Sequence, residues 1–133
     1  MRVKARVISR GYTEGEAVVS KKRISFLGDV DPDTGLITAK DSDIYGLKIS
    51  NKVLIFPRGR GSTVGSYILY KMKKRNTAPA AIINLETELI IAVGAIIAGI
   101  PLVDKPEVDL TELIKTGTFV KVNANEGWIE WEN

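Results

Sequence analysis

The N-terminal part of the chain has the hydrophobic pattern of β structure. Residues 2–7 alternate Arg or Lys with Val or Ala, which is the period-2 pattern of a half-buried strand. Gly11 and Gly15 are expected to bracket a turn, and residues 17–19 to begin a second strand. Residues 31–35 then combine a proline with a glycine that is free to adopt a positive φ. This part therefore predicts strands joined by tight turns.

The centre of the chain predicts a strand–loop–helix–strand unit. Residues 53–56 are uninterruptedly apolar, as expected of a strand buried on both faces, and Pro57 ends it. Residues 58–61 must form a loop, and Ser62 has the identity and position of a helix N-cap. Apolar residues then follow at helical spacing: Val64, Tyr67, Ile68 and Met72. Residues 80–83 predict another buried strand, so we expect a right-handed crossover that joins parallel strands.

A long apolar stretch, residues 89–103, carries no charge at all. We predict a helix over residues 87–98, stopped by Gly99, and a strand over residues 100–103. Such a helix has no polar face, so it should be buried all round or covered by a partner. Gly94 lies inside it, and close backbone packing is one reason to place a glycine there.

The C-terminal part predicts a short helix followed by a hairpin. The helix is expected over residues 109–115, before Gly117. Strands are expected over residues 118–122 and 128–131, separated by a segment rich in Asn and Gly. The chain has no repeat, linker or low-complexity segment. We therefore predict a single domain over residues 1–133 of the α/β (mixed β/α) class, with β structure at both ends and a βαβ centre.

Composition narrows the chemistry that this chain can perform. Its 133 residues include no cysteine and no histidine, which excludes a thiolate nucleophile, an imidazole base and any metal site built on these side chains. Lys and Arg number 19 against 16 Asp and Glu, and the net charge of +3 is too weak to require a nucleic-acid partner. The N-terminus lacks the apolar core of a signal peptide, and residues 89–103 are fewer than the ~20 that span a bilayer. We expect a cytoplasmic protein without a membrane partner.

The loop between the first central strand and its helix is the strongest candidate site. Gly59 and Gly61 allow the backbone to fold tightly, and the helix start that follows offers unpaired N–H groups. Arg58 and Arg60 carry guanidinium groups that suit a carboxylate or a phosphate. Ser62 adds a hydroxyl group beside them. The combination predicts an anion site at the carboxyl end of a central strand, the usual ligand position in open α/β sheets.

Two known glycine-rich motifs do not fit this loop. A Walker A loop needs Gly-Lys followed by Ser or Thr, and no lysine lies between Gly59 and Tyr70. The dinucleotide fingerprint fails because Val64 stands where the third small residue belongs. Nucleotide binding is therefore disfavoured. On pattern alone, the alternative stays open that Ser62 is only a helix cap and the glycines only form a turn.

Other polar and aromatic clusters have simpler explanations. Residues 21–23 form a short basic run, which we interpret as a solvated surface and not as a nucleic-acid contact. The basic residues 71–75 are favoured at the C-terminus of a helix. Asp41 and Asp43 could be metal ligands, but without a supporting cluster a polar loop is the better interpretation. Tyr67 is expected to be a packing residue.

Three ordered blocks, residues 57–67, 79–84 and 92–101, resemble the aconitase X small-subunit family, and the resemblance covers nearly the whole chain. It implies a swivelling β/β/α domain, like the mobile small domain of aconitase. It also implies a heterodimer with a large subunit that carries an iron–sulfur cluster and most substrate contacts, with no cofactor or metal bound by this chain.

The same resemblance implies an activity. In archaea, members of this family are hydro-lyases that remove water from (R)-5-phosphomevalonate, a small phosphorylated hydroxy acid, giving trans-anhydromevalonate 5-phosphate in the mevalonate route to isoprenoids. Other members dehydrate cis-3-hydroxy-L-proline. The family's active-site serine, a proton acceptor, falls on Ser62.

Roles for the neighbours of Ser62 remain open at this point. Gly61 and Thr63 would supply backbone near a developing oxyanion. Arg58, Gly59 and Arg60 are candidate anion contacts, and either arginine could instead hold the loop or an interface. Two other classes also stay open, a non-catalytic anion-binding module and a structural partner that docks through the apolar stretch.

Overall fold

The computed structural model describes residues 1–132, and most of its strands belong to a single curved sheet. Along this eight-stranded sheet the order is β1-β10-β9-β3-β6-β7-β8-β2. The strands are β1 (Arg2–Lys4), β2 (Arg6–Ser9), β3 (Tyr12–Val19), β6 (Val53–Phe56), β7 (Ala81–Asn84), β8 (Leu102–Asp104), β9 (Phe119–Asn123) and β10 (Trp128–Trp131). A separate two-stranded hairpin joins β4 (Val30–Asp31) to β5 (Leu36–Ile37).

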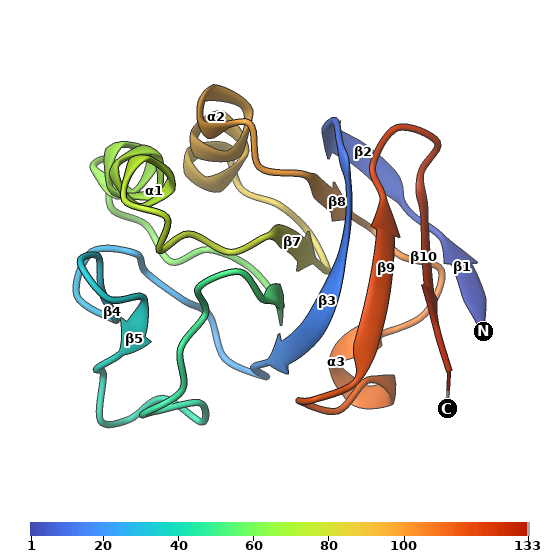
Figure 1. Ribbon diagram of the computed structural model, residues 1–133, viewed down its shortest axis with the longest axis horizontal. Helices are drawn as coiled ribbons and strands as arrows, with labels where there is room; N and C mark the ends of the chain where they lie inside the picture. The colour runs from blue at the N-terminus through green and yellow to red at the C-terminus, as the bar shows by residue number, and fades with distance from the viewer. Residues whose placement is uncertain (133) are drawn as a thin grey trace.

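The two edges of the large sheet meet, so that it curls into a barrel-like wall (Figure 1). Strands β1 and β2 lie at opposite ends of the strand order, yet only Ala5 separates them in the chain. The Ala5 N–H donates to the carbonyl of Gly127 at 3.0 Å, which holds the break between the two strands. The end of β10 lies beside the N-terminus, where the N-terminal amine donates to the carbonyl of Trp131 at 2.7 Å.

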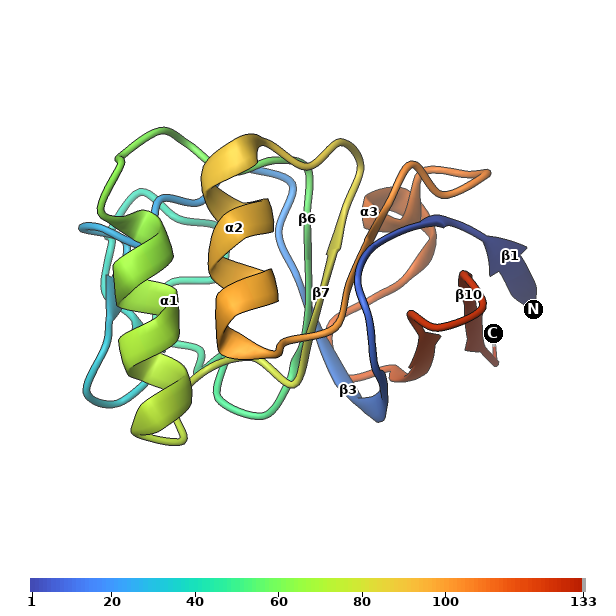
Figure 2. The ribbon, with the colours of Figure 1, turned by 90° about the horizontal axis from the view of Figure 1, so that it is seen from above.

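The centre of the sheet is the predicted βαβ unit. Strands β3, β6, β7 and β8 pair in parallel, and α1 (Gly65–Lys74) and α2 (Leu89–Ala98) connect β6 to β7 and β7 to β8. Figure 2 shows both helices side by side on one side of β6 and β7, running in the same direction. The mixed α/β class predicted from the sequence is therefore confirmed, with β6 and α2 close to their predicted positions.

Strand β6 explains the continuous apolar run at residues 53–56, because its two faces belong to two different cores. Leu54 and Phe56 pack towards the helices with Leu69 of α1. Val53 and Ile55 face the inside of the barrel, among side chains of β7, β9 and β10. All four β6 side chains are fully buried, as expected of a central strand covered on both sides.

The N-terminal predictions need two corrections. The expected strand over residues 2–7 is divided at Ala5 because its first half pairs with β10 and its second half with β8. Gly15 does not bracket a turn but lies inside β3, opposite Val120 of β9. The turn at residues 31–35 is confirmed, and Gly35 adopts a φ of 77° there.

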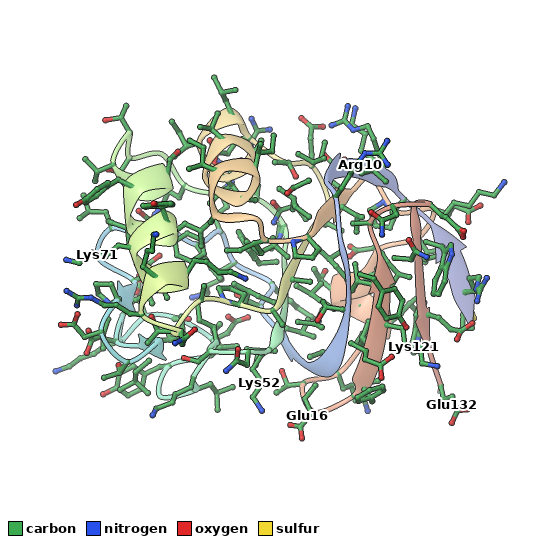
Figure 3. All side chains as sticks on the ribbon, turned by 45° about the horizontal axis from the view of Figure 1, so that its top comes forward. Arg10, Glu16, Lys52, Lys71, Lys121 and Glu132 are labelled. Atoms are coloured by element: carbon green, nitrogen blue, oxygen red, sulfur yellow. The ribbon has the colours of Figure 1, made fainter. Side chains whose placement is uncertain are left out.

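Helix α1 buries only part of the predicted stripe, because Met72 is buried and Ile68 packs against the core. Its buried residues are Gly65, Leu69 and Met72, whereas Val64 and Tyr67 are exposed. The prediction of Tyr67 as a packing residue is therefore wrong. The buried side of α1 differs from the predicted side because α2 packs against one flank of α1. The spacing of residues within α1 does not reveal this neighbour. Lys71, on the outer side of α1, points away from the sheet (Figure 3), as a solvated residue near a helix end should.

Helix α2 ends as predicted and begins two residues late. Gly99 adopts a φ of 71° and ends the helix, and Glu88 is its N-cap. A Cβ atom on Gly94 would lie 3.0 Å from the Cα atom of Ser66, so glycine is needed for the close approach of α1. Nothing within residues 1–132 covers the outer side of α2, where several apolar side chains are exposed. No helix in that range is long and apolar enough to cross a bilayer.

The remaining elements follow their predictions closely. The short helix α3 spans Leu110–Leu113, and β9 and β10 form the predicted C-terminal hairpin. At the start of β6, Lys52 pairs with Glu16 of β3 at 3.3 Å, and Figure 3 shows these two side chains next to each other. These contacts lie at the amino end of β6, away from the candidate site.

Candidate functional site

The glycine-rich loop leaves β6 at the carboxyl edge of the parallel strands and leads into α1. Its backbone is paired with Ile24, because the Arg60 N–H donates to the Ile24 carbonyl at 2.9 Å and the Ile24 N–H donates to the Arg58 carbonyl at 3.3 Å. This pairing holds the loop backbone beside Ile24. It also brings the basic residues 21–23, interpreted from the sequence as a plain solvated surface, next to the loop.

Ser62 does not cap α1 with its side chain, so the N-cap prediction is wrong. The N-cap position belongs to Val64, which makes no side-chain capping bond, and the Ser62 carbonyl accepts the N–H of Gly65 at 3.0 Å. In the described part of the chain, the Ser62 hydroxyl has no hydrogen-bond partner. Ser62 is half-buried, so the residue is partly open to another molecule.

The backbone around Ser62 presents hydrogen-bond donors. Among residues 1–132, no acceptor is found for the N–H groups of Gly61, Ser62, Thr63 and Val64. These groups precede the first turn of α1, where the helix dipole adds partial positive charge. A run of unpaired N–H groups next to a hydroxyl suits a developing negative charge on the hydroxyl oxygen or on a bound group.

The two loop glycines serve different purposes, and neither adopts a positive φ. A Cβ atom on Gly59 would lie 2.5 Å from Oε1 of Glu88 and 2.6 Å from Cγ1 of Ile91, so the start of α2 leaves no room for a side chain. A Cβ atom on Gly61 would meet nothing within 4 Å. The sequence predicted that both glycines allow tight folding of the loop. In the structure Gly59 is needed for close packing against α2, whereas Gly61 lies beside open space.

Both loop arginines are paired with carboxylates. Arg58 contacts Glu86 at 3.1 Å, and Arg60 contacts Asp29 at 3.0 Å. Both side chains of the Arg58–Glu86 pair are exposed, so this pair contributes at most about 1 kcal/mol to stability. In the other pair Arg60 is exposed, whereas Asp29 is largely buried. The pairs support the interpretation in which the arginines hold the loop. Glu86 and Asp29 were missed as site residues because nothing in their spacing relates them to the loop.

A chain of hydrogen bonds, part-buried along most of its length, runs from Arg6 to the end of β6. Asp104, at the end of β8, accepts two bonds from Arg6 at 2.8 Å and one from the N–H of Thr87 at 2.8 Å. The Thr87 hydroxyl donates to Asn84 at 3.2 Å, and the Asn84 amide donates to the carbonyl of Phe56 at 3.1 Å. Phe56 is the last residue of β6, so the chain ends where the loop begins.

Asp104 and Arg6 are the groups in this network whose pKa values the surroundings shift. Burial of Asp104 opposes its ionisation, but the hydrogen bonds from Arg6 and Thr87 outweigh this effect and hold the pKa of Asp104 below its ordinary value. The Asp104 carboxylate is therefore ionised at neutral pH although the side chain is fully buried. The pKa of Arg6 is raised by the same contact.

The described residues do not form a metal centre. No group of three or more His, Cys, Asp or Glu side chains that could hold an ion is found in residues 1–132. Asp43 instead accepts bonds from the Ser20 hydroxyl at 2.6 Å and the Lys21 N–H at 2.8 Å. The chain has no cysteine, so its residues do not fit an iron–sulfur cluster.

The sequence matches a known protein family. The family model of the aconitase X swivel domain matches residues 2–131. A phosphomevalonate dehydratase small subunit from Methanosarcina mazei is 56% identical over 98% of this chain and 90% of that protein. The protein of the same name from Thermococcus onnurineus is 55% identical over 99% of both chains.

A solved structure agrees with the fold. A chain in the crystal structure of Thermococcus kodakaraensis aconitase X, described as the holo-form, matches with a TM-score of 0.94 and 52% identity. The match covers 100% of this chain and 99% of that chain. The sequence-based resemblance is therefore confirmed, and the chain belongs to the aconitase X swivel-domain family.

Proposed function

We propose that this chain is the small subunit of a hydro-lyase that dehydrates (R)-5-phosphomevalonate to trans-anhydromevalonate 5-phosphate. The observation that carries the proposal is the identity of about 55% with archaeal proteins named phosphomevalonate dehydratase small subunit, over nearly the full length of both chains. The matched region includes the loop at residues 58–62, where a free hydroxyl and unpaired N–H groups lie together.

The active enzyme is a heterodimer with a large subunit. The name of the relatives supports a larger partner, and this chain offers only one side of a site. An iron–sulfur cluster, which would act as the Lewis acid for the departing hydroxyl, belongs to the large subunit because this chain has no ligands for it.

Ser62 is the proton acceptor in this proposal. A C–H bond next to the substrate carboxylate breaks, its proton moves to Oγ of Ser62, and its electron pair forms the new C=C bond. Ser62 enters the step as its alkoxide, after releasing its own proton to solvent, and regains a proton from the C–H bond. The hydroxyl group on the neighbouring carbon takes up a proton from solvent and leaves as water, so the step releases one water and consumes no net proton. A serine hydroxyl is a weak base, so the reaction needs surroundings that stabilise its alkoxide form.

The backbone around Ser62 provides that stabilisation. The unpaired N–H groups of Gly61 and Thr63 flank the hydroxyl at the positive end of α1 and favour negative charge on Oγ or on the enolate-like substrate. Arg58 and Arg60 keep this loop in place through Glu86 and Asp29. Either guanidinium group can contact the substrate as well, because each is about half exposed.

The direct test is to mix the purified chain with its large subunit and to measure the dehydration of (R)-5-phosphomevalonate. The pair should form trans-anhydromevalonate 5-phosphate, and neither subunit alone should do so. Turnover of cis-3-hydroxy-L-proline by the same pair, with none of phosphomevalonate, would contradict the proposed substrate and leave the hydro-lyase chemistry in place.

A further inference from the structure

The outer face of α2 is apolar and uncovered by the rest of the chain. Leu89 is 73% exposed, Ile96 57% and Ile97 61%, and Val93 lies between them at 37%. These four side chains occupy one side of the helix, whereas Ile91, Gly94, Ala95 and Ala98 occupy the buried side. We refer to Leu89, Val93, Ile96 and Ile97 as the α2 strip.

The start of α1 packs beside α2 and adds exposed apolar residues of its own. A Cβ atom on Gly65 would lie 3.2 Å from a methyl group of Ile90, and the Ser66 hydroxyl donates to the Ile90 carbonyl at 2.6 Å, so the two helices touch at these residues. Beside this contact, Val64 and Tyr67 expose further apolar surface. Figure 2 shows that the chain enters both helices at the same end.

This surface also adjoins the candidate site. Leu89 follows Glu88, whose carboxylate lies against Gly59, and Val64 is two residues from Ser62. A partner protein that covers Ser62 would therefore also lie next to the α2 strip. An exposed apolar patch of this kind marks an interaction site. Residues 89–103 carry no charge, and charged residues are depleted in the buried core of protein interfaces.

We infer that the α2 strip, together with Val64 and Tyr67, is a principal contact surface for the large partner subunit. The inference rests on the proposed function, which requires such a subunit to close over Ser62. The partner surface should be a complementary apolar patch located beside the half of the site that the large subunit contributes. Docking there would bury the apolar face that a free chain exposes to water.

The test measures binding of the large subunit, without substrate, to chains that carry Leu89→Glu or Ile97→Lys. A negative charge suits the first turn of a helix and a positive charge suits the last, so neither change should unfold α2. Each should raise the Kd of the complex at least about tenfold, because a charge would be buried against an apolar partner. Because the two charges differ in sign, a long-range electrostatic effect would move the two Kd values in opposite directions.

Leu113→Glu is the matched control, since Leu113 is a half-exposed apolar residue on α3, away from α1 and α2 (Figure 1). It should leave the Kd unchanged, and Ile97→Lys at saturating subunit should retain wild-type turnover within about threefold. Unchanged Kd values in both strip variants would overturn the inference, as would failure of the wild-type chain to bind.

Two further measurements test the other occupants of the strip. The first measures dimer formation by the isolated chain, and the second measures its binding to vesicles of mixed neutral and anionic phospholipids. If the strip variants abolish either of these and leave binding of the large subunit unchanged, a second copy or a membrane covers the strip. The inference would then be wrong. A wild-type pair that binds but does not dehydrate phosphomevalonate would contradict only the proposed function.

Discussion

The side chain of Ser62 lies where the backbone offers donors and no acceptor. A capping serine would accept the N–H of a residue two or three positions later, but Ser62 precedes the cap position, and only its carbonyl reaches Gly65. Its hydroxyl therefore has no role in holding α1. From the sequence alone, Ser62 could be either a chemical group of the site or a helix cap. This geometry favours the chemical role.

Replacement of Gly59 should destabilise the chain, whereas the same replacement at Gly61 should not. Gly59→Ala forces a methyl group against Glu88 and Ile91, and overpacking of this kind costs about 1–3 kcal/mol. Gly61→Ala meets open space and should change the free energy of unfolding by less than about 0.5 kcal/mol. Urea unfolding of the two variants measures both values, and equal stabilities would contradict the contact at Gly59.

At the scale of elements, the start of α2 depends on Glu88. The Glu88 carboxylate accepts the N–H groups of Ile90 and Ile91, each at 2.8 Å. Glu88→Ala should therefore cost about 0.5–2 kcal/mol of unfolding free energy. Glu86→Ala, which removes only the exposed pair with Arg58, should cost at most about 1 kcal/mol. Chemical denaturation would test this ranking, and a larger loss for Glu86→Ala would refute the capping role.

The sequence was informative where local chemistry determines an element. The apolar run of β6, the turn at residues 31–35 and the glycine that stops α2 were predictable, because burial, proline and a positive φ act over a few residues. The buried stripe of α1 was not predictable, because the contact of Ser66 with α2 decides which flank is covered. Gly15 was predicted at a turn because glycine favours turns, but it pairs with Val120 of β9 in the middle of β3.

Most of the loop's supports could not be identified from the sequence either. Asp29, Glu86 and Asn84 reach the loop only through the tertiary fold, and no spacing relates them to it. Asp104 is the clearest case, because a buried carboxylate at the end of a strand is meaningful only once its partner Arg6 is known. Local motifs located the loop itself, whereas the contacts that hold it depend on topology.

At the scale of the whole molecule, the two cores share β6, β7 and β8, so we expect them to unfold together. Trp131 lies in the core inside the barrel, and the helices cover the other core. Tryptophan fluorescence and far-UV circular dichroism should therefore give coincident denaturation curves. Two separated transitions would contradict the prediction that residues 1–133 form a single domain.

Acid should weaken the fold through Asp104. Because the folded pKa of this group lies below its unfolded value of about 4, its contribution to stability is fully present above that value. The contribution is lost as the pH falls through the folded pKa. Asp104→Asn should cost about 1–3 kcal/mol at neutral pH, and the difference from wild type should shrink below about pH 4. A difference that does not change with pH would contradict the ionised state of Asp104.

The central claim is that the Ser62 hydroxyl accepts the substrate proton, and its most direct test is turnover of the assembled heterodimer carrying Ser62→Ala. Phosphomevalonate dehydration should fall by at least about 100-fold while the complex still assembles. Ser66→Ala is the matched control, because that hydroxyl only bonds the Ile90 carbonyl and its loss should leave turnover near wild type. Near-normal turnover by the Ser62→Ala complex would contradict the role of Ser62 as proton acceptor.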